Sequence, residues 1–298
     1  MHFGLNTYHI TDRYGRYESG KLDPGALLYS VKEIFSQGFM HVELLLDVDM
    51  KPLQTLNDET ISSLNQFATM HGISYSGHLP YKYVDISSLN EPIRKASVSV
   101  IKRAIEIADR IGVDKLVLHP AGSETKGFDN AWYPATVGVR KEIINDMVSQ
   151  LRISLKEILS TQDSRRICLE NLPYLDYTPF ESVVSDFDLG VCLDVGHCIL
   201  RKDDPVDFFK KYSDRVGVIH FHDVILYDTG NGSKLLDHEP LGSGIVDIKR
   251  FLDTLQSYSF NGPIVLEHLE EQKALKSIEY LKSRNYLTMA DTILPKKS

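Results

Sequence analysis

Short runs of apolar residues typical of strands alternate along the chain with longer segments whose apolar residues recur at helical spacing. The runs predict eight strands, at residues 3–8, 41–46, 74–79, 115–119, 167–171, 190–194, 216–222 and 263–267. Eight βα units in strict alternation predict a parallel sheet, and eight strands are the number that closes into a filled barrel. We therefore expect a single α/β domain, a (β/α)8 TIM barrel, over residues 1–287, with a loose tail at 288–298.

Helix start and stop signals support this division. Asn57 precedes a periodic segment that stops at Gly72, and Pro92 stands in the first turn of a longer one that ends at Gly112. Asp204 precedes another predicted helix. A doubly wound open sheet is the main competing architecture, but no GxGxxG motif follows the first predicted strand, which favours the barrel.

Composition narrows the functional class. The net charge is −8 and the isoelectric point is about 5.8, which argues against a broad grip on a phosphate backbone. None of the three cysteines belongs to a CxxC pair, so we expect reduced thiols and a cytoplasmic protein. The N-terminal residues lack the apolar core of a signal peptide, and no run is long and apolar enough to predict a membrane span.

Polar residues gather where six consecutive predicted strands end, which is where TIM barrels place functional residues. These residues are His78, His119, Glu170, Asp194, His220 with His222 on the same strand face, and Glu267. His197 follows the sixth strand, and the loop after the seventh carries Asp237 and His238. Unpaired charges are unfavourable inside a barrel, whereas imidazole and carboxylate together suit a divalent ion. The pattern therefore predicts a metal site, with His220 preferred over His222 as the ligand from the seventh strand.

Other polar residues are assigned differently. No basic residue ends a predicted strand, so ion pairs inside the barrel do not explain the carboxylates. Glu43 lies inside a strand from which it could line the site, but it is not assigned to it, and His268 is expected to be structural. For some residues, substrate contact and simple loop packing stand as equal alternatives: Tyr81, Trp132, Tyr133 and Asn171.

From the first strand to the eighth, this pattern resembles the xylose isomerase-like barrel superfamily, which includes endonuclease IV, sugar epimerases and sugar-phosphate isomerases. The resemblance to the isomerase branch implies one divalent ion bound by Glu170, Asp194, His220 and Glu267. The resemblance to endonuclease IV implies a trinuclear zinc site with further ligands at His78, His119, His197, Asp237 and His238. Its loop motif is Asp-x-His, whereas Asp237 and His238 are adjacent, as in the related cobamide-remodelling phosphodiesterases.

Two functions use this set of residues. We favour a hydrolase of a phosphodiester in a small molecule, with a di- or trinuclear site and Glu170 and Glu267 as catalytic residues. Zn²⁺ is the preferred ion, with Mn²⁺, Mg²⁺ and Co²⁺ as alternatives. The alternative is an isomerase or epimerase of a sugar or sugar phosphate, in which one ion and the same two glutamates move a proton. Cleavage of DNA at abasic sites is a lesser alternative, because nucleic acid is not a favoured partner, and a non-catalytic sugar- or metal-binding barrel is the last.

Overall fold

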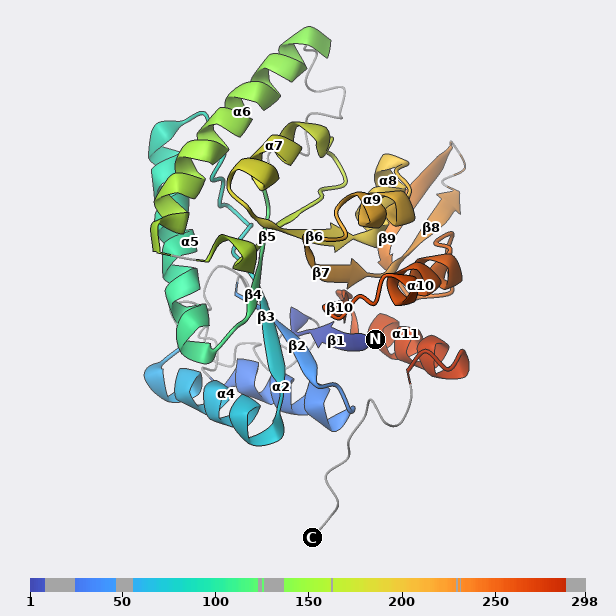
Figure 1. The fold of residues 1–298 in the computed structure, drawn as a ribbon. Helices are drawn as coiled ribbons and strands as arrows, with labels where there is room; N and C mark the ends of the chain where they lie inside the picture. The colour runs from blue at the N-terminus through green and yellow to red at the C-terminus, as the bar shows by residue number, and fades with distance from the viewer. Residues whose placement is uncertain are drawn as a thin grey trace.

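The computed structural model describes residues 1–8, 25–46, 56–122, 125, 137–161, 163–228, 230 and 232–287. Eight parallel strands close into a barrel, in the order β1, β10, β7, β6, β5, β4, β3 and β2 (Figure 1). The strands are β1 (His2–Asn6), β2 (His41–Leu45), β3 (Ser74–His78), β4 (Lys115–Leu118), β5 (Ile167–Glu170), β6 (Gly190–Asp194), β7 (Val216–Phe221) and β10 (Pro263–Leu266). The predicted single (β/α)8 barrel is confirmed. Several strands end one or two residues earlier than expected, so His119, Asn171, His222 and Glu267 lie just beyond their strands.

Helices surround the barrel (Figure 1). They are α2 (Ala26–Ser36), α4 (Asp58–His71), α5 (Glu91–Ile111), α6 (Val137–Ile158), α7 (Thr178–Asp186), α8 (Val195–Arg201), α9 (Pro205–Lys211), α10 (Ile248–Ser257) and α11 (Glu271–Ser283), with 3₁₀ turns at Leu159–Thr161 and Ser164–Arg166. The predicted boundary signals act as expected. Asn57 accepts a hydrogen bond from the Thr60 amide at 2.8 Å, and Asp204 accepts one from Val206 at 2.8 Å. Gly72 and Gly112 end their helices at φ 69° and 89°.

The alternation of side chains along each strand separates an apolar layer inside the barrel from a polar layer above it. Five buried residues form the apolar layer: Val117, Cys168, Cys192, Val218 and Val265. Two residues further along the same strands stand His119, Glu170, Asp194, His220 and Glu267. Since strand side chains repeat with a period of two, both layers face the barrel axis. The polar layer is therefore placed at the carboxyl end of the barrel by the same periodicity that packs its core.

An antiparallel hairpin follows β7 and was not predicted from the sequence. It consists of β8 (Asp223–Asp228) and β9 (Ser233–Glu239), and it extends beside the barrel next to α8 and α10 (Figure 1). The sequence analysis expected Asp237 and His238 in a loop, but both belong to β9. His238 has φ 56°, a left-handed conformation that is uncommon for residues other than glycine.

Asp223 anchors the segment that returns from this hairpin. The buried carboxylate accepts four backbone hydrogen bonds, from Val224 and Val246 to Oδ1 and from Gly242 and Gly244 to Oδ2, at 2.8 to 3.1 Å. A Cβ atom on Gly244 would lie 2.1 Å from the carbonyl oxygen of Val224, so only glycine allows this approach. Asp223 thus fixes the chain that carries Asp237 and His238 past the mouth of the barrel.

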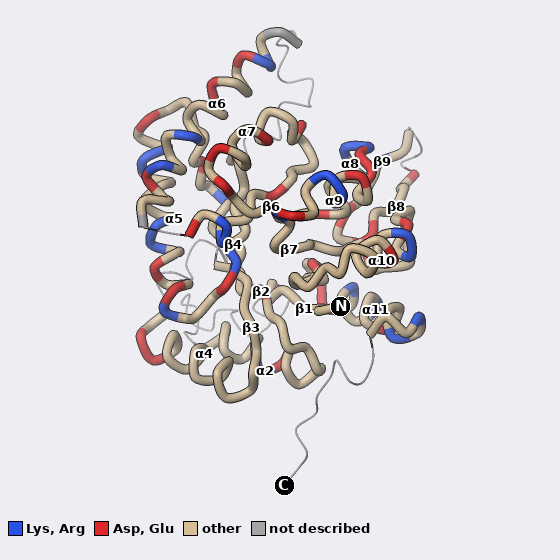
Figure 2. The backbone as a smooth tube through the Cα atoms, in the orientation of Figure 1, with Lys and Arg blue, Asp and Glu red and all other residues tan. Residues whose placement is uncertain are grey.

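Charged residues of both signs are interspersed along the outer helices, as α5 shows (Figure 2). This mixture agrees with the modest net charge of −8 and does not favour a surface built to follow a phosphate backbone. No helix among the described residues is both long and apolar enough to span a membrane. All three cysteines are buried and free, as the sequence analysis expected.

Substitution of Asp223 tests the anchoring role. Asp223→Ala leaves four backbone N–H groups without their acceptor, so we expect the free energy of unfolding to fall by about 3 kcal/mol. Denaturant unfolding followed by circular dichroism measures this change. The matched control is Asp253→Ala on the exposed face of α10, where an ion pair with Lys249 contributes less than about 1 kcal/mol. Equal stability losses in the two variants would contradict the role of Asp223.

Candidate metal centre

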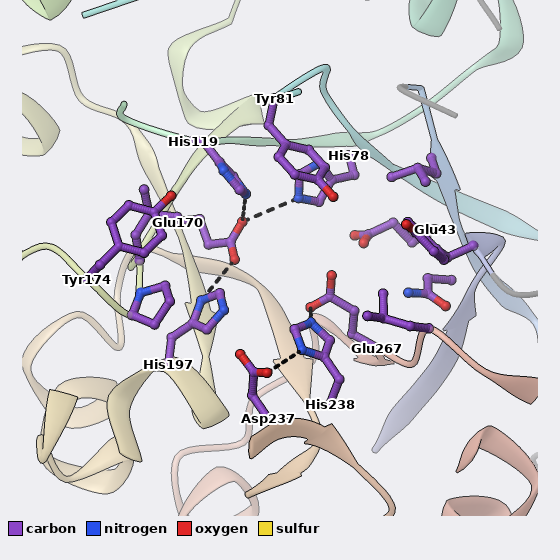
Figure 3. Close-up of a pocket in the computed structure, with 16 residues that line it drawn as sticks. Glu43, His78, Tyr81, His119, Glu170, Tyr174, His197, Asp237, His238 and Glu267 are labelled. Atoms are coloured by element: carbon purple, nitrogen blue, oxygen red, sulfur yellow. Dashed lines mark ion pairs between the residues drawn. The ribbon is translucent and has the colours of Figure 1, made fainter. Parts of the chain in front are cut away.

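A cavity of about 280 Å³ opens at the carboxyl end of the barrel strands (Figure 3). Its lining carries histidines and carboxylates from most of the strands: Glu43, His78, His119, Glu170, His197, Asp237, His238 and Glu267. Asp194 and His220 lie beneath this floor and are fully buried. The structure therefore brings every metal-site residue predicted from the sequence to one end of the barrel.

One group of donors converges on a single nitrogen of His220. His220 Nδ1 lies 3.0 Å from Glu267 Oε2, 3.7 Å from Glu170 Oε1 and 3.9 Å from Asp194 Oδ2. These four residues come from β5, β6, β7 and the end of β10, which are consecutive around the barrel. Three carboxylates and one imidazole are a suitable ligand set for a divalent ion such as Mn²⁺, Zn²⁺, Co²⁺ or Mg²⁺.

A second group uses the other oxygen of Glu170. His119 Nε2 lies 3.0 Å and His78 Nε2 3.4 Å from Glu170 Oε2 (Figure 3). His78 Nδ1 lies 2.9 Å from the carbonyl oxygen of Leu79, so Nδ1 must donate, and in the neutral ring the lone pair of Nε2 is left available to a metal ion. Glu170 thus presents one oxygen to each group, which is the geometry of a carboxylate that can bridge two ions.

Unsatisfied polar atoms show that these residues fit a cation. Among the described residues, Glu170 Oε2, Glu267 Oε2 and both ring nitrogens of His220 are buried without a hydrogen-bond partner of acceptable geometry. Buried polar groups are rarely left in this state, because desolvation without a partner costs several kcal/mol. A metal ion at the convergence point would supply the missing partner to Glu267 Oε2 and His220 Nδ1. Glu170 Oε2 faces His78 and His119 instead, where the second group of donors lies.

When no ion is bound, the protonation of the site residues compensates the buried negative charge. Burial opposes a charge on His220, but Cys192, Glu267 and Glu43 outweigh it and raise the pKa of His220 well above its usual value. Burial likewise opposes the ionised form of Glu170, yet His119, His197 and His220 hold its pKa well below its usual range. For His119, burial prevails over Glu170 and lowers the pKa of the imidazole. Protons on histidine therefore take the place that a cation would fill.

His222 contacts the predicted ligand Asp194, and its ring also belongs to a set of donors with His238 and Glu267 that lie close enough to share an ion. Its Nδ1 accepts a hydrogen bond of 2.9 Å from the backbone N–H of His238, which can only donate. The proton of the neutral ring therefore lies on Nε2, 3.2 Å from the Asp194 carboxylate. The carbonyl of Asp223, 3.2 Å from Nδ1, is the weaker of two competing partners. This arrangement supports the preference for His220 over His222 as the ligand.

Two local features make room for the hydrogen bond from the backbone N–H of His238 to His222 Nδ1. A Cβ atom on Gly196 would lie 2.0 Å from the His222 ring, so the first turn of α8 can pass this imidazole only with glycine there. The left-handed conformation of His238 accompanies the placement of its N–H opposite His222 Nδ1. Gly196 lies in the first turn of α8, a helix capped by Asp194, which accepts from the His197 amide at 2.7 Å.

Asn171 was weighed as a substrate contact, but its amide is committed elsewhere. Its Oδ1 accepts from the Asp194 amide at 2.7 Å, and its Nδ2 donates to the Asp194 carbonyl at 2.9 Å. Its own carbonyl lies 2.9 Å from His197 Nδ1, which leaves His197 Nε2 unprotonated in the neutral ring. Asn171 thus joins the ends of β5 and β6. Tyr81 does line the cavity, and Trp132 and Tyr133 lie outside the described residues.

The third ion implied by the resemblance to endonuclease IV has weaker support. Asp237 Oδ1 lies 3.3 Å from His238 Nδ1, so the adjacent pair interact with each other. His238 Nε2 points instead toward Glu267 Oε2, at 3.7 Å. Within the described part of the chain, the sets of donor atoms close enough to share an ion do not include Asp237 or combine His197 with His238. Although Asp237 and His238 are adjacent, the left-handed conformation of His238 accompanies an arrangement in which both side chains line the cavity and pair with each other.

Glu43 is the residue that sequence reasoning left out. It is buried in β2, and its Oε1 lies 3.0 Å from His220 Nε2. Its position in the middle of a strand hid it, because the strand-end rule selects only terminal residues. A signal was nevertheless present: Glu43 stands two residues after His41, so both polar residues share the interior face of an otherwise apolar strand.

Comparison with known proteins identifies the family to which the chain belongs. Residues 31–284 match the family described as xylose isomerase-like TIM barrel. An uncharacterized protein of Methanocaldococcus jannaschii is 26% identical over 240 residues, which cover 79% of this chain and 84% of the relative. A "probable endonuclease 4" of Ureaplasma parvum is 22% identical over 251 residues, 80% of each chain. The solved structure of a D-tagatose 3-epimerase-like protein superposes with a TM-score of 0.71 at 22% identity, covering 96% of this chain and 97% of the other. The resemblance noted from the sequence is thereby confirmed, and the chain belongs to the xylose isomerase-like TIM barrel family.

Proposed function

We propose that the protein is a divalent-metal-dependent epimerase or isomerase of a small sugar or sugar phosphate. The observation that carries this proposal is the convergence of Glu170, Asp194 and Glu267 on His220 Nδ1 at one end of the barrel. That set supplies the ligands for one ion and includes two carboxylates that also line the cavity, Glu170 and Glu267. The cavity volume of about 280 Å³ suits a small molecule.

The chain provides the proton transfers that this reaction requires. A bound divalent ion would polarise the carbonyl and the neighbouring hydroxyl of the sugar. Glu170 and Glu267 belong to β5 and to the end of β10, so they reach the cavity from different sides of the barrel (Figure 3). One carboxylate removes the proton from the carbon beside the carbonyl, and the other, which enters the step protonated, gives its proton to the opposite face and inverts that centre. Proton exchange with solvent then restores the starting forms of the two carboxylates. Burial beneath the cavity floor keeps Asp194 and His220 away from this exchange.

The comparisons support this function over the one that the sequence analysis favoured. The sequence favoured a phosphodiester hydrolase because of the additional histidines, and it kept the epimerase as the alternative. The solved structure named as D-tagatose 3-epimerase-like spans 96% of this chain, although at 22% identity it establishes the fold alone. The hydrolase prediction relied partly on a third ion. Because the donor geometry gives that ion weak support, the case for the hydrolase is weaker.

A second candidate, hydrolysis of a small phosphodiester, is favoured by one specific observation. His78 and His119 surround Glu170 Oε2, which gives a second group of donors that shares a carboxylate with the first. Two ions that share a bridging carboxylate can stabilise both the attacking and the leaving oxygen of a phosphoryl transfer. A one-ion epimerase does not require this second group.

Solvent hydrogen exchange tests the epimerase directly. In D₂O, the metal-loaded protein is expected to introduce deuterium at the carbon beside the carbonyl of a ketopentose, a ketohexose or one of their phosphates. Glu170→Gln and Glu267→Gln each remove one base, so the rate of exchange at saturating metal should fall by about 10² to 10⁴. Proton NMR measures the exchange. The matched control is Glu106→Gln on the exposed side of α5, which should keep the wild-type rate. Absence of exchange with every sugar in the panel would count against the proposal.

A phosphodiester assay separates the two candidates. With bis(p-nitrophenyl) phosphate and Zn²⁺ or Mn²⁺, the epimerase account predicts no hydrolysis above the metal-only background. It also predicts that His119→Ala still exchanges deuterium into its sugar, because His119 is not part of the group around His220. Hydrolysis that disappears in His119→Ala, without any exchange into sugars, would instead establish the second candidate.

A further inference from the structure

A column of buried polar side chains runs through the barrel beneath the metal centre. From the lower end, Ser74 Oγ lies 2.8 Å from His41 Nδ1, and His41 Nε2 lies 3.0 Å from Ser76 Oγ. Ser76 Oγ donates to Glu43 Oε2 at 2.9 Å, and Glu43 Oε1 lies 3.0 Å from His220 Nε2. The first four residues come from the neighbouring strands β2 and β3, whose register pairs His41 with Ser74 and Glu43 with Ser76.

The carboxylate of Glu43, at the upper end of the column, fixes the direction of each hydrogen bond below it. A carboxylate only accepts, so Ser76 donates to Glu43 and must itself accept from His41 Nε2. Burial, with a smaller contribution from His2, lowers the pKa of His41 to about 3, so its ring is neutral. His41 Nδ1 then accepts from Ser74. Every donor below Glu43 points up the column, and every group has one consistent role.

We infer that Glu43 is a positioning residue that holds the imidazole of His220 for metal binding by placing its carboxylate 3.0 Å from Nε2, where its charge attracts the proton of that nitrogen. His220 presents Nδ1 to the three carboxylates and Nε2 to Glu43, on the other side of the ring. A hydrogen bond from the distal nitrogen to a carboxylate fixes the tautomer and raises the basicity of the ligating nitrogen. The column of Ser76, His41 and Ser74 holds Glu43 in that place. This inference rests on the proposed function only in taking His220 as a ligand.

The packing around Glu43 indicates that it positions His220 and is not itself a metal ligand. Glu43 faces the nitrogen of His220 that is directed away from Glu170, Asp194 and Glu267. Within the described part of the chain, the sets of donors close enough to share an ion do not include Glu43. The carboxylate is 1% exposed, accepts from Ser76 on one oxygen and pairs with the His220 ring on the other.

Metal affinity, measured without reference to activity, tests the inference. Chelator-treated protein is titrated with Co²⁺ in competition with a chromophoric chelator, and the visible absorption spectrum of the bound Co²⁺ is recorded. In Glu43→Gln the side chain keeps its shape beside His220 but carries no charge, so we expect affinity to fall by about tenfold. In Glu43→Ala the acceptor is gone, and we expect a fall of about 100-fold with an altered Co²⁺ spectrum. Ser76→Ala should fall between wild type and Glu43→Ala. Glu106→Gln is the control and should match wild type.

The outcomes distinguish this inference from the proposed function. Wild-type affinity and an unchanged Co²⁺ spectrum in both Glu43 variants would overturn the positioning role while leaving the epimerase intact. If Glu43→Ala does not fold, Glu43→Gln decides, because it preserves shape and hydrogen bonding. A wild-type protein that binds no divalent ion would overturn the proposed function and this inference with it.

Discussion

Three carboxylates buried around one imidazole nitrogen impose the constraint on which the rest of this structure depends. Glu170, Asp194 and Glu267 have carboxylate oxygens within 3.9 Å of His220 Nδ1, at the base of the cavity. Negative charges at this density are unfavourable in a protein interior unless positive charge compensates them. Acidic neighbours raise the pKa of His220 well above its usual value and that of His197 to about 9 against the effect of burial, so these histidines carry compensating charge when no ion is bound.

The surrounding structure holds these groups in place. Asp194 receives hydrogen bonds from the His197 amide and the His222 ring, and its backbone is clamped by Asn171. His222 can reach it because Gly196 leaves space for the ring, and the tautomer of His222 is set by the N–H of His238. The hairpin that carries His238 is in turn fastened by Asp223. A polar network of this kind is stable because each buried donor finds an acceptor.

The strand-end rule explains how much of this could be foreseen. A period of two along apolar strands, together with the geometry of a closed barrel, was enough to place Glu170, Asp194, His220 and Glu267 in one layer. Glu43 escaped that rule because it stands in mid-strand, and its role depends on a contact across the barrel with β7. The hairpin escaped because its strands follow β7 without a helix between them, where an α/β alternation predicts a loop. The tautomers of His78, His197 and His222 depend on single backbone atoms that no sequence pattern records.

Metal content per chain is the measurement that tests the central claim most directly. Elemental analysis of protein purified without chelator or affinity-column metal, followed by titration of the chelator-treated protein, gives both the number and the identity of bound ions. The account predicts one tightly bound divalent ion per chain, whose removal lowers the thermal unfolding temperature because the ion binds only the folded state. A protein that contains no divalent ion, and whose unfolding temperature does not respond to added Mn²⁺, Co²⁺, Zn²⁺ or Mg²⁺, would contradict it.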